Sequence, residues 1–229
     1  MGDSNEVNWH PTNYRTHTLG EISSNGVNFI GSVVTLCGFG EIIRGKGGVC
    51  FIKLRDGTGQ LQAFIKKGNV SDEELELSQN ASRESTFQIT GEIAQKRPPR
   101  VPEGEPTPPI EYEIVANKIN ILSIAKTPMP LGVTDKVEVG MDVRLDNRFL
   151  DLRRKHINAM FKLRSRILQY GREHLISEGF GEINSPKIIA AAAEGGTNLF
   201  PIKYFEREAY LSQSPQLYKQ LAVMGNLER

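Results

Sequence analysis

Hydrophobic and polar residues alternate with a period close to two between Gly31 and Ile124, which is the pattern of half-buried β-strands. The alternation predicts strands at 33–43, 49–56, 60–66, 86–95 and 111–123. After the third of these, Ser71 is followed three residues later by Glu74, which is the spacing of a helix-starting capping box. The first half of the chain is therefore predicted to form five strands, with one short helix after the third.

This order of elements favours a five-stranded Greek-key barrel of the OB type, although the pattern alone also fits another small β-domain. The segment 96–109, between the fourth and fifth strands, is too rich in proline for regular structure. In OB folds this loop commonly helps to hold nucleic acid, and a bare connector is the alternative. Residues 125–154 combine proline turns with a charged run, so we expect them to be a hinge between domains.

From Lys155 onward the apolar positions take a helical period, and Gly179 is the expected end of this helix. A strand-like piece should then lead to Pro186, and two short strands should follow near 199–204 and 208–212. Between Pro186 and those strands, the run AAAAEGGTN places Glu194 among small residues. A carboxylate in such a run suits a loop that closes over a ligand.

Alternate residues of the second predicted strand differ in chemistry. One set is apolar and belongs inside the barrel: Cys50, Ile52 and Leu54. The residues that alternate with them should stand on the outer face: Phe51, Lys53 and Arg55. The third strand should add its own outward residues to this face: Gln60, Gln62 and Phe64. Rings stack on bases, cations hold phosphates and amides read base edges, so this face has the chemistry of single-stranded nucleic-acid binding. The alternative is that the two phenylalanines are covered by a neighbouring loop or domain.

A short amphipathic helix is expected near the end of the chain, within LSQSPQLYKQLAVMGNLER. Ser214 can cap it, Pro215 suits its first turn and Gly225 can end it. Gln216 and Lys219 lie three residues apart, on a face that the apolar residues leave free. An amide and an ammonium group on one face suit a carboxylate ligand, and the alternative is an ordinary helix with a solvated lysine.

Composition narrows the function classes only a little. The chain has 229 residues, 38% hydrophobic and 24% charged, enough for one or two domains, and its net charge of +1 gives no bulk attraction for nucleic acid. No apolar run approaches the ~20 residues that span a bilayer, and the N-terminus lacks a secretory pattern, so no membrane association is expected. Cys37 and Cys50 are too few for a disulfide framework or a metal cluster, and we expect buried free thiols in the cytoplasm.

Four blocks of sequence resemble the class IIb aspartyl-tRNA synthetases of the archaeal and eukaryotic type. GGVCFIKLRDGTGQLQAF is similar to their anticodon-binding strands, and RLDNRFLDLRR to the start of their catalytic domain. FKLRSRILQYGREHLISEGFGEINSPKI resembles class II motif 1, which ends here at Pro186. EGG and QSPQLYKQ together resemble the aspartate-specific pocket, and the second of these favours aspartate over asparagine or lysine.

The resemblance implies an OB-fold anticodon-binding domain over 1–124, a hinge over 125–154, and the first part of a class II antiparallel-sheet catalytic domain over 155–229. The implied activity is the ATP-dependent formation of aspartyl-adenylate and the transfer of aspartate to tRNA. The implied setting is a cytoplasmic homodimer.

The resemblance also implies roles for four residues of the amino acid pocket. Glu194 would meet the ammonium group of aspartate, and Lys219 would neutralise its side-chain carboxylate. Ser214 and Gln216 would add hydrogen bonds. Asparagine would be rejected, because its amide lacks the charge that the lysine requires.

On the barrel, the resemblance implies that Phe51 stacks on an anticodon base while Arg44 and Gln62 make polar contacts with the RNA. Pro186 would lie in the dimer interface, as motif 1 does in this class.

The chain ends at Arg229, where motif 2 would begin in this family. The motif 2 and motif 3 arginines that hold ATP would therefore lie outside it, together with the ATP and Mg²⁺ site of the complete enzyme. The resemblance thus predicts a fragment that is inactive alone and binds neither ATP nor Mg²⁺ tightly. Two alternatives stay open: a non-catalytic OB-fold tRNA-binding protein, and a fragment of a lysyl- or asparaginyl-tRNA synthetase.

Overall fold

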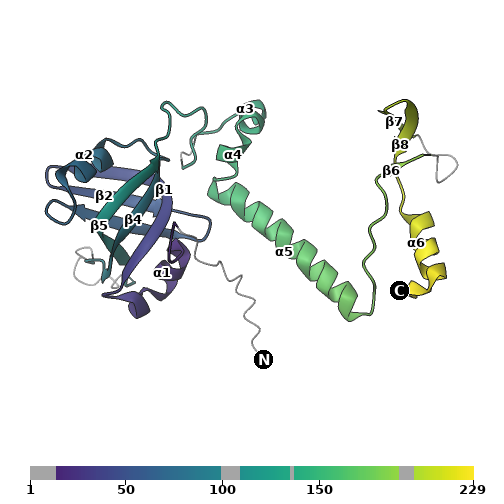
Figure 1. The fold of residues 1–229 in the computed structure, drawn as a ribbon, viewed down its shortest axis with the longest axis horizontal. Coiled ribbons are helices and arrows are strands. Elements are labelled where there is room, and N and C mark those ends of the chain that lie inside the picture. Colours follow the sequence, from purple (N-terminus) through teal and green to yellow (C-terminus); the bar gives the residue numbers. More distant parts are fainter. Residues whose placement is uncertain (1–13, 99–108, 135–136, 191–198) are drawn as a thin grey trace. The chain divides into compact units, whose positions relative to one another are not determined.

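The computed structural model describes residues 14–98, 109–134, 137–190 and 199–229. The chain divides into two compact units, Met1–Arg148 and Phe149–Arg229 (Figure 1). No helix among the described residues is long and apolar enough to cross a lipid bilayer. The finer division into a barrel domain, a hinge and a catalytic segment stays a prediction.

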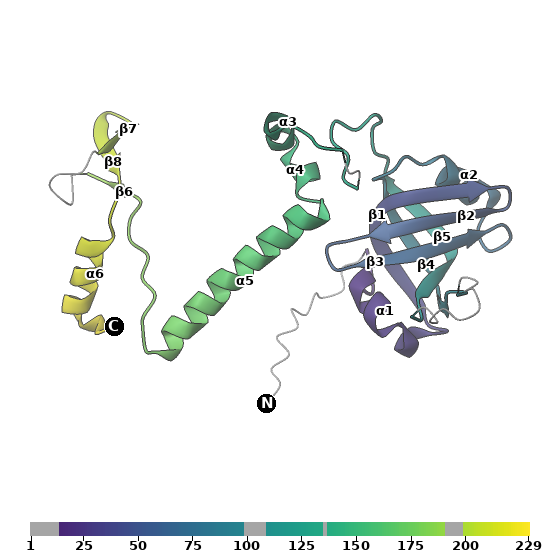
Figure 2. The same cartoon turned by 180° about the vertical axis from the view of Figure 1, so that it is seen from behind.

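The first unit is built on a closed barrel, whose strands in the described residues are β1 (Val33–Lys46), β2 (Val49–Arg55), β3 (Gln60–Lys66), β4 (Thr86–Gln95) and β5 (Tyr112–Ser123). Their spatial order is β1-β2-β3-β5-β4, and β4 pairs with β1 to close the sheet (Figures 1 and 2). β3 and β5 run parallel, whereas the other neighbours run antiparallel. The predicted OB-type barrel is confirmed: the five strands occur where the alternation indicates, a helix follows the third, and the strands close into a barrel.

Alternate residues of the strands point into the barrel and form its core. The inward positions predicted for β2 and β3 are all buried: Cys50, Ile52, Leu54, Leu61, Ala63 and Ile65. Phe87 of β4 is among the largest fully buried side chains, and its ring lies against the backbone of Gly40. A Cβ at residue 40 would approach that ring to 2.6 Å, so glycine leaves the space that the ring occupies.

Two helices of this unit begin with capping boxes. As predicted, α2 (Asp72–Asn80) begins where Ser71 Oγ accepts a hydrogen bond from Glu74 N at 3.1 Å, and Glu74 accepts one from Ser71 N at 2.9 Å. Helix α1 (Leu19–Asn25) begins with a second box, made by Thr18 and Glu21, and continues into a 3-10 helix, η1 (Gly26–Phe29). α1 was not among the predicted elements, although THTLGE carries the same Ser/Thr-to-Glu spacing.

Glu74 links the stability of the barrel to pH. Its carboxylate accepts a hydrogen bond from Ile119 N of β5 at 3.0 Å, and the bonds from Ile119 and Ser71 lower the pKa of Glu74. A pKa that is lower in the folded chain means that ionised Glu74 stabilises the fold above its ordinary pKa of 4.5. This contribution is lost as the pH falls through the folded value.

We therefore expect Glu74→Gln to lower the free energy of unfolding more at pH 7 than at pH 3, in urea titrations followed by circular dichroism. Glu76→Gln, on the exposed side of the same helix, is the matched control. Equal losses for Glu74→Gln at the two pH values would contradict a pH-linked role.

The region predicted as a hinge contains two short helices, α3 (Met141–Asp146) and α4 (Arg148–Asp151). In the second unit, α5 (Lys155–Ser177) ends as predicted at Gly179, whose φ of +82° is left-handed. Gly179 N donates to the Ile176 carbonyl at 2.9 Å, and Phe180 N to the Leu175 carbonyl at 3.0 Å. These bonds satisfy the last carbonyls of the helix, as a left-handed glycine allows.

Three described strands form the small sheet of the second unit, in the order β6 (Ile188–Ile189), β8 (Arg207–Leu211) and β7 (Phe200–Tyr204). The two strands predicted near 199–204 and 208–212 are confirmed. The strand-like piece predicted before Pro186 is wrong, because pairing with β8 begins only at Ile188. A proline has no N–H to give to a strand ladder, and the segment before it has no partner among the described strands.

The last helix, α6 (Gln216–Ala222), continues into a π-helical turn, η2 (Val223–Leu227). The residue directly before the helix is Pro215, one position after the predicted cap Ser214. Ser214 Oγ still accepts a hydrogen bond from Gln216 N at 3.0 Å, as the side chain of an N-cap serine does. Gly225 does not end the helix. The left-handed residue is Asn226, with φ +76°.

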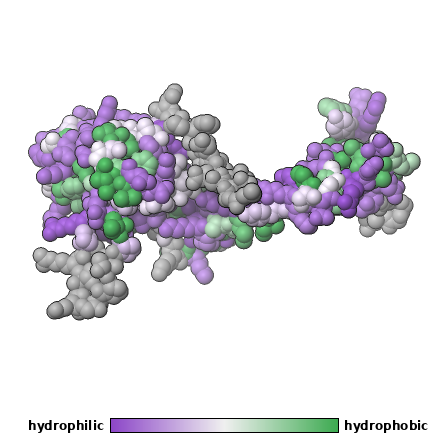
Figure 3. Space-filling model, turned by 90° about the horizontal axis from the view of Figure 1, so that it is seen from below, coloured by the Kyte–Doolittle hydropathy of each residue, from purple (hydrophilic) through white to green (hydrophobic). Residues whose placement is uncertain are grey.

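Apolar side chains of the second unit are largely exposed. Of the apolar residues that recur at helical spacing along α5, Ile157 is buried, whereas Met160, Phe161, Ile167, Leu168 and Leu175 are exposed. The apolar residues at helical spacing in α6 and η2 are exposed too: Leu217, Leu221 and Met224. Figure 3 shows such hydrophobic residues in green at the surface, among hydrophilic ones.

Candidate nucleic-acid interface

The outer face of β1, β2 and β3 carries polar and aromatic side chains in register. Arg44 lies opposite Phe51, and Phe51 lies opposite Phe64, which makes an aromatic row (Arg44, Phe51 and Phe64) across the three strands. Two residues away along the strands, Lys53 lies opposite Gln62. Residues two apart share a face, so the fold brings together the three residues predicted to contact RNA.

The two phenylalanines of this row stack on each other. Their ring centroids lie 5.1 Å apart with an interplanar angle of 25°. Phe64 is half-buried, whereas Phe51 is 37% exposed. Phe64 therefore supports the Phe51 ring from one side, and the Phe51 ring stays accessible in the described part of the chain. The proline-rich loop, predicted to hold nucleic acid, falls mainly on 99–108, outside the described residues.

A groove of about 740 Å³ runs over this face. Its lining is Ser23, Ile42, Arg44, Phe51, Lys53, Gln60, Leu61, Gln62, Lys96, Ile110, Glu111 and Tyr112. The alternation predicts the outward-facing members from β2 and β3, but it misses the two walls that α1 and β5 supply through Ser23 and Tyr112. Those two walls reach the groove only through tertiary packing, which no single strand pattern reveals.

Acidic side chains orient the polar groups of the groove. Gln62 Nε2 donates to Glu113 Oε2 at 2.7 Å, so this amide has a fixed direction. Gln60 donates to Glu41, and Lys53 Nζ lies 3.8 Å from Glu41 Oε1. Amides and a cation held in this way are suited to polar contacts with base edges and phosphates.

Arg55 departs from the sequence prediction. It should stand on the outer face, yet it is only 7% exposed. Its Nη2 donates to Glu84 at 2.5 Å, its Nε lies 3.5 Å from Glu41 Oε2, and its guanidinium carbon lies 5.7 Å from the Phe39 ring centroid. Glu41 stands at a bulge in β1 and Glu84 in the turn before β4. Arg55 is therefore buried and paired with two glutamates, so it is not one of the cations that face a ligand in the groove.

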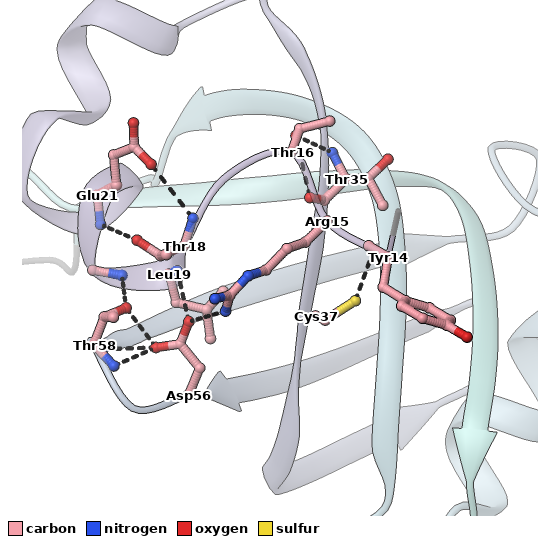
Figure 4. Close-up of polar contacts among 12 residues, drawn as sticks. Tyr14, Arg15, Thr16, Thr18, Leu19, Glu21, Thr35, Cys37, Asp56 and Thr58 are labelled. Atoms are coloured by element: carbon pink, nitrogen blue, oxygen red, sulfur yellow. Dashed lines mark hydrogen bonds and ion pairs between the residues drawn. The ribbon is translucent and has the colours of Figure 1, made fainter. Parts of the chain in front are cut away.

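Helix α1 is fixed against the β2–β3 turn by Asp56 (Figure 4). Asp56 Oδ2 accepts a hydrogen bond from Leu19 N at 3.0 Å, and Oδ1 accepts from Thr58 N at 2.7 Å. Thr58 Oγ1 in turn accepts from Gly20 N at 2.9 Å. These bonds satisfy two N–H groups of the first turn of α1, so the helix forms a defined wall of the groove.

Burial disfavours the thiolate form of both cysteines. Cys50 is fully buried, and burial raises its pKa to about 11. Cys37 is half-buried rather than buried as predicted, because it alternates with the inward positions of β1 and points to the outer side of the barrel. There its Sγ donates to the Tyr14 carbonyl at 2.9 Å. Burial raises the pKa of Cys37, and nearby Arg15 opposes that shift. Both thiols are free, as expected.

The residues predicted to bind aspartate are described only in part, since Glu194 lies outside the described residues. Ser214 is half-buried just before α6, while Gln216 and Lys219 are exposed on its first turns. Their spacing puts the amide and the ammonium group on neighbouring positions of one helix face. Pro186 is exposed between α5 and β6. The binding and interface roles of these residues stay predictions.

Both halves of the chain match models of known protein families. Residues 27–122 match the family model of the OB-fold nucleic acid binding domain. Residues 140–229 match that of the tRNA synthetases class II (D, K and N).

Similar proteins carry related names. An aspartate--tRNA(Asp/Asn) ligase of Methanosarcina barkeri is 40% identical over 94% of this chain and 46% of its own length. The structure of asparaginyl-tRNA synthetase from Pyrococcus horikoshii, complexed with asparaginyl-adenylate, has a TM-score of 0.71 and 30% identity, covering 86% of this chain and 43% of its own. Aspartyl tRNA synthetase from Entamoeba histolytica has a TM-score of 0.66 and 30% identity, covering 87% and 41%. The chain spans about half the length of the curated relatives it matches.

Proposed function

This chain belongs to the class II tRNA synthetases for aspartate, lysine and asparagine, and we propose that it serves the ATP-dependent attachment of aspartate to tRNA. The observation that carries the RNA half of this proposal is Phe51, an exposed ring stacked on Phe64 inside a polar groove. The names of the curated relatives and the QSPQLYKQ block support aspartate as the amino acid.

The proposed reaction has two steps. The α-carboxylate of aspartate attacks the α-phosphorus of ATP, which gives aspartyl-adenylate and releases pyrophosphate. The terminal ribose hydroxyl of the tRNA then attacks the activated carbonyl and releases AMP. Positioning and electrostatic stabilisation supply the rate enhancement, and no side chain is required as a general base.

In this proposal, Lys219 pairs with the side-chain carboxylate of aspartate, and Ser214 and Gln216 orient it through hydrogen bonds. Glu194 binds the substrate ammonium group. Charge-assisted bonds of this kind are short and directional, so they select a charged side chain over the amide of asparagine.

ATP and Mg²⁺ belong to the chemistry of this family, and the proposal gives them no ligand in this chain. The described residues contain no group of three or more His, Cys, Asp or Glu side chains that could hold a metal ion. The roles that we propose for the residues of this chain are the binding of aspartate and of tRNA. We also propose a homodimer, with Pro186 in its interface, and a cytoplasmic location that suits the free thiols.

Asparagine is the second candidate substrate, because asparaginyl-tRNA synthetases are among the similar structures. Amino-acid-dependent ATP–pyrophosphate exchange by the full-length gene product separates the candidates. We expect exchange with aspartate to exceed exchange with asparagine or lysine. A preference for either of the other two would refute the specificity, and no exchange at all would favour a non-catalytic tRNA-binding protein.

Phe51→Ala should weaken binding of an anticodon stem-loop RNA to this chain by about 1–3 kcal/mol, because the stacked base loses its platform. Fluorescence anisotropy with labelled RNA measures the change. The control is Leu122→Ala, an exposed apolar residue near the end of β5 and outside the groove lining. Unchanged affinity in the Phe51 variant would mean that this ring only packs against Phe64.

A further inference from the structure

A second row of side chains crosses the barrel beside the aromatic row. Lys46 of β1 lies opposite Val49 of β2, and Val49 lies opposite Lys66 of β3. Each of the three is two residues along its strand from a member of the aromatic row. The two lysines therefore share the outer face with that row, about 7 Å further along the strands. We call Lys46 and Lys66 the cation row.

The lysines of the cation row have no counter-ion among the described residues. Both are exposed, and neither forms an ion pair with an acid in that part of the chain. Lys67, the next residue, differs because its Nζ lies 3.1 Å from Asp72 Oδ2. Two such ammonium groups at the ends of one row create a local positive potential that attracts an anion. The chain as a whole does not, since its net charge is only +1.

Helix α2 holds the hairpin that carries this row. Gln79 Nε2 donates to the carbonyls of Gly47 at 2.9 Å and of Val49 at 3.1 Å. On the other side of the turn, Lys67 N donates to the Gly48 carbonyl at 2.8 Å. The tip of the β1–β2 hairpin is thus fixed by side-chain and backbone bonds before any ligand arrives. Such preorganisation reduces the entropy lost on binding.

We propose that the cation row binds backbone phosphates of the RNA nucleotides next to the base that stacks on Phe51. This inference rests on the proposed binding of RNA. A base laid on Phe51 leaves its sugar-phosphate chain free to run along the strand direction, and the first cations on that path toward the hairpin tip are Lys46 and Lys66. Phosphate contacts fix the position and direction of a nucleic acid without reading its sequence. The row therefore sets the path of the RNA, while the groove reads its bases.

The salt dependence of binding tests this role. Dissociation constants of an anticodon stem-loop RNA are measured for the whole chain and for Lys46→Gln, Lys66→Gln and the double variant, between 0.1 M and 1 M KCl. Removing one lysine–phosphate interaction with single-stranded RNA should reduce the slope of log affinity against log salt by about 0.7. The lines should meet near 1 M salt. At 0.1 M, each single variant should then bind about fivefold more weakly and the double variant about 25-fold.

Lys67→Gln is the matched control, because it removes the same charge one residue away, from a lysine that already has a partner. Its slope should equal that of the parent chain. The loss in the double variant should also be the same for a stem-loop with an altered loop sequence. An unaltered slope in the double variant, with Phe51→Ala still weakening binding, overturns the cation row alone. If the parent chain does not bind the stem-loop, RNA binding and the cation row fall together.

Discussion

Replacing Lys219 by methionine in the full-length gene product should reduce aspartate activation at least a hundredfold, or about 3 kcal/mol in transition-state stabilisation. Methionine keeps the length of the lysine stem but removes the charge that we propose to pair with the substrate carboxylate. Without this cation, the free-energy cost of removing water from the substrate carboxylate is no longer offset by an ion pair. The measurement is kcat/KM for aspartate in ATP–pyrophosphate exchange.

The discrimination between aspartate and asparagine separates a binding role from a structural one. Loss of the lysine should lower the ratio of kcat/KM for the two amino acids, since asparagine makes no charged contact to lose. Lys203→Met, on the exposed face of β7, is the matched control and should leave both values unchanged. Activation by the Lys219 variant within threefold of the parent enzyme would reject the assigned role.

The second large effect concerns the stability of the barrel. Arg55→Met should destabilise it by about 3–5 kcal/mol, because the change leaves buried Glu41 and Glu84 without the cation between them. Both glutamates are at most 7% exposed, so water cannot replace the guanidinium. The amides of β1 and β2 exchange hydrogen with solvent when the barrel unfolds. Their exchange rates at neutral pH therefore measure the loss in the free energy of unfolding.

The exposed pair between Lys96 and Glu111 supplies the comparison for this prediction. Lys96→Met removes a cation of the same kind from solvent-accessible surroundings and should cost less than about 1 kcal/mol. Adding Glu41→Gln and Glu84→Gln to the Arg55 variant should recover part of the loss, because neutral amides are less costly to bury than carboxylates that have lost the guanidinium. A cost for Arg55→Met as small as that for Lys96→Met would show that the buried carboxylates find other partners.

The barrel was predictable from sequence because one face of each strand is buried. The core requires apolar side chains at alternate positions, as at Cys50, Ile52 and Leu54. The same pattern therefore shows both where a strand lies and which of its side chains point inward. Arg55 shows the limit of this logic. It occupies an outward position in the pattern, but a bulge at Glu41 and a turn at Glu84 bring acids over it. Neither acid is near Arg55 in sequence.

The candidate site divides in the same way. Phe51 and Gln62 follow from facing within a strand, whereas Ser23 and Tyr112 enter the groove from elements far away in the chain. For α1, the Thr18–Glu21 capping signal was present in the sequence, but its docking depends on Asp56. In the second unit, the helical period predicted α5 correctly, yet most of the apolar residues of that helix are exposed. A period reports that a face is apolar and leaves open what covers it.

The parallel pairing of β3 with β5 constrains how this protein is made on the ribosome. β5 bonds to both β3 and β4, so the barrel cannot close until Ser123 has left the exit tunnel. Before that moment the nascent chain can hold only an open sheet, in the order β4-β1-β2-β3, with two free edges. Exposed strand edges pair readily with other chains, so the interval between the synthesis of β4 and β5 is when this nascent polypeptide most needs protection from its neighbours.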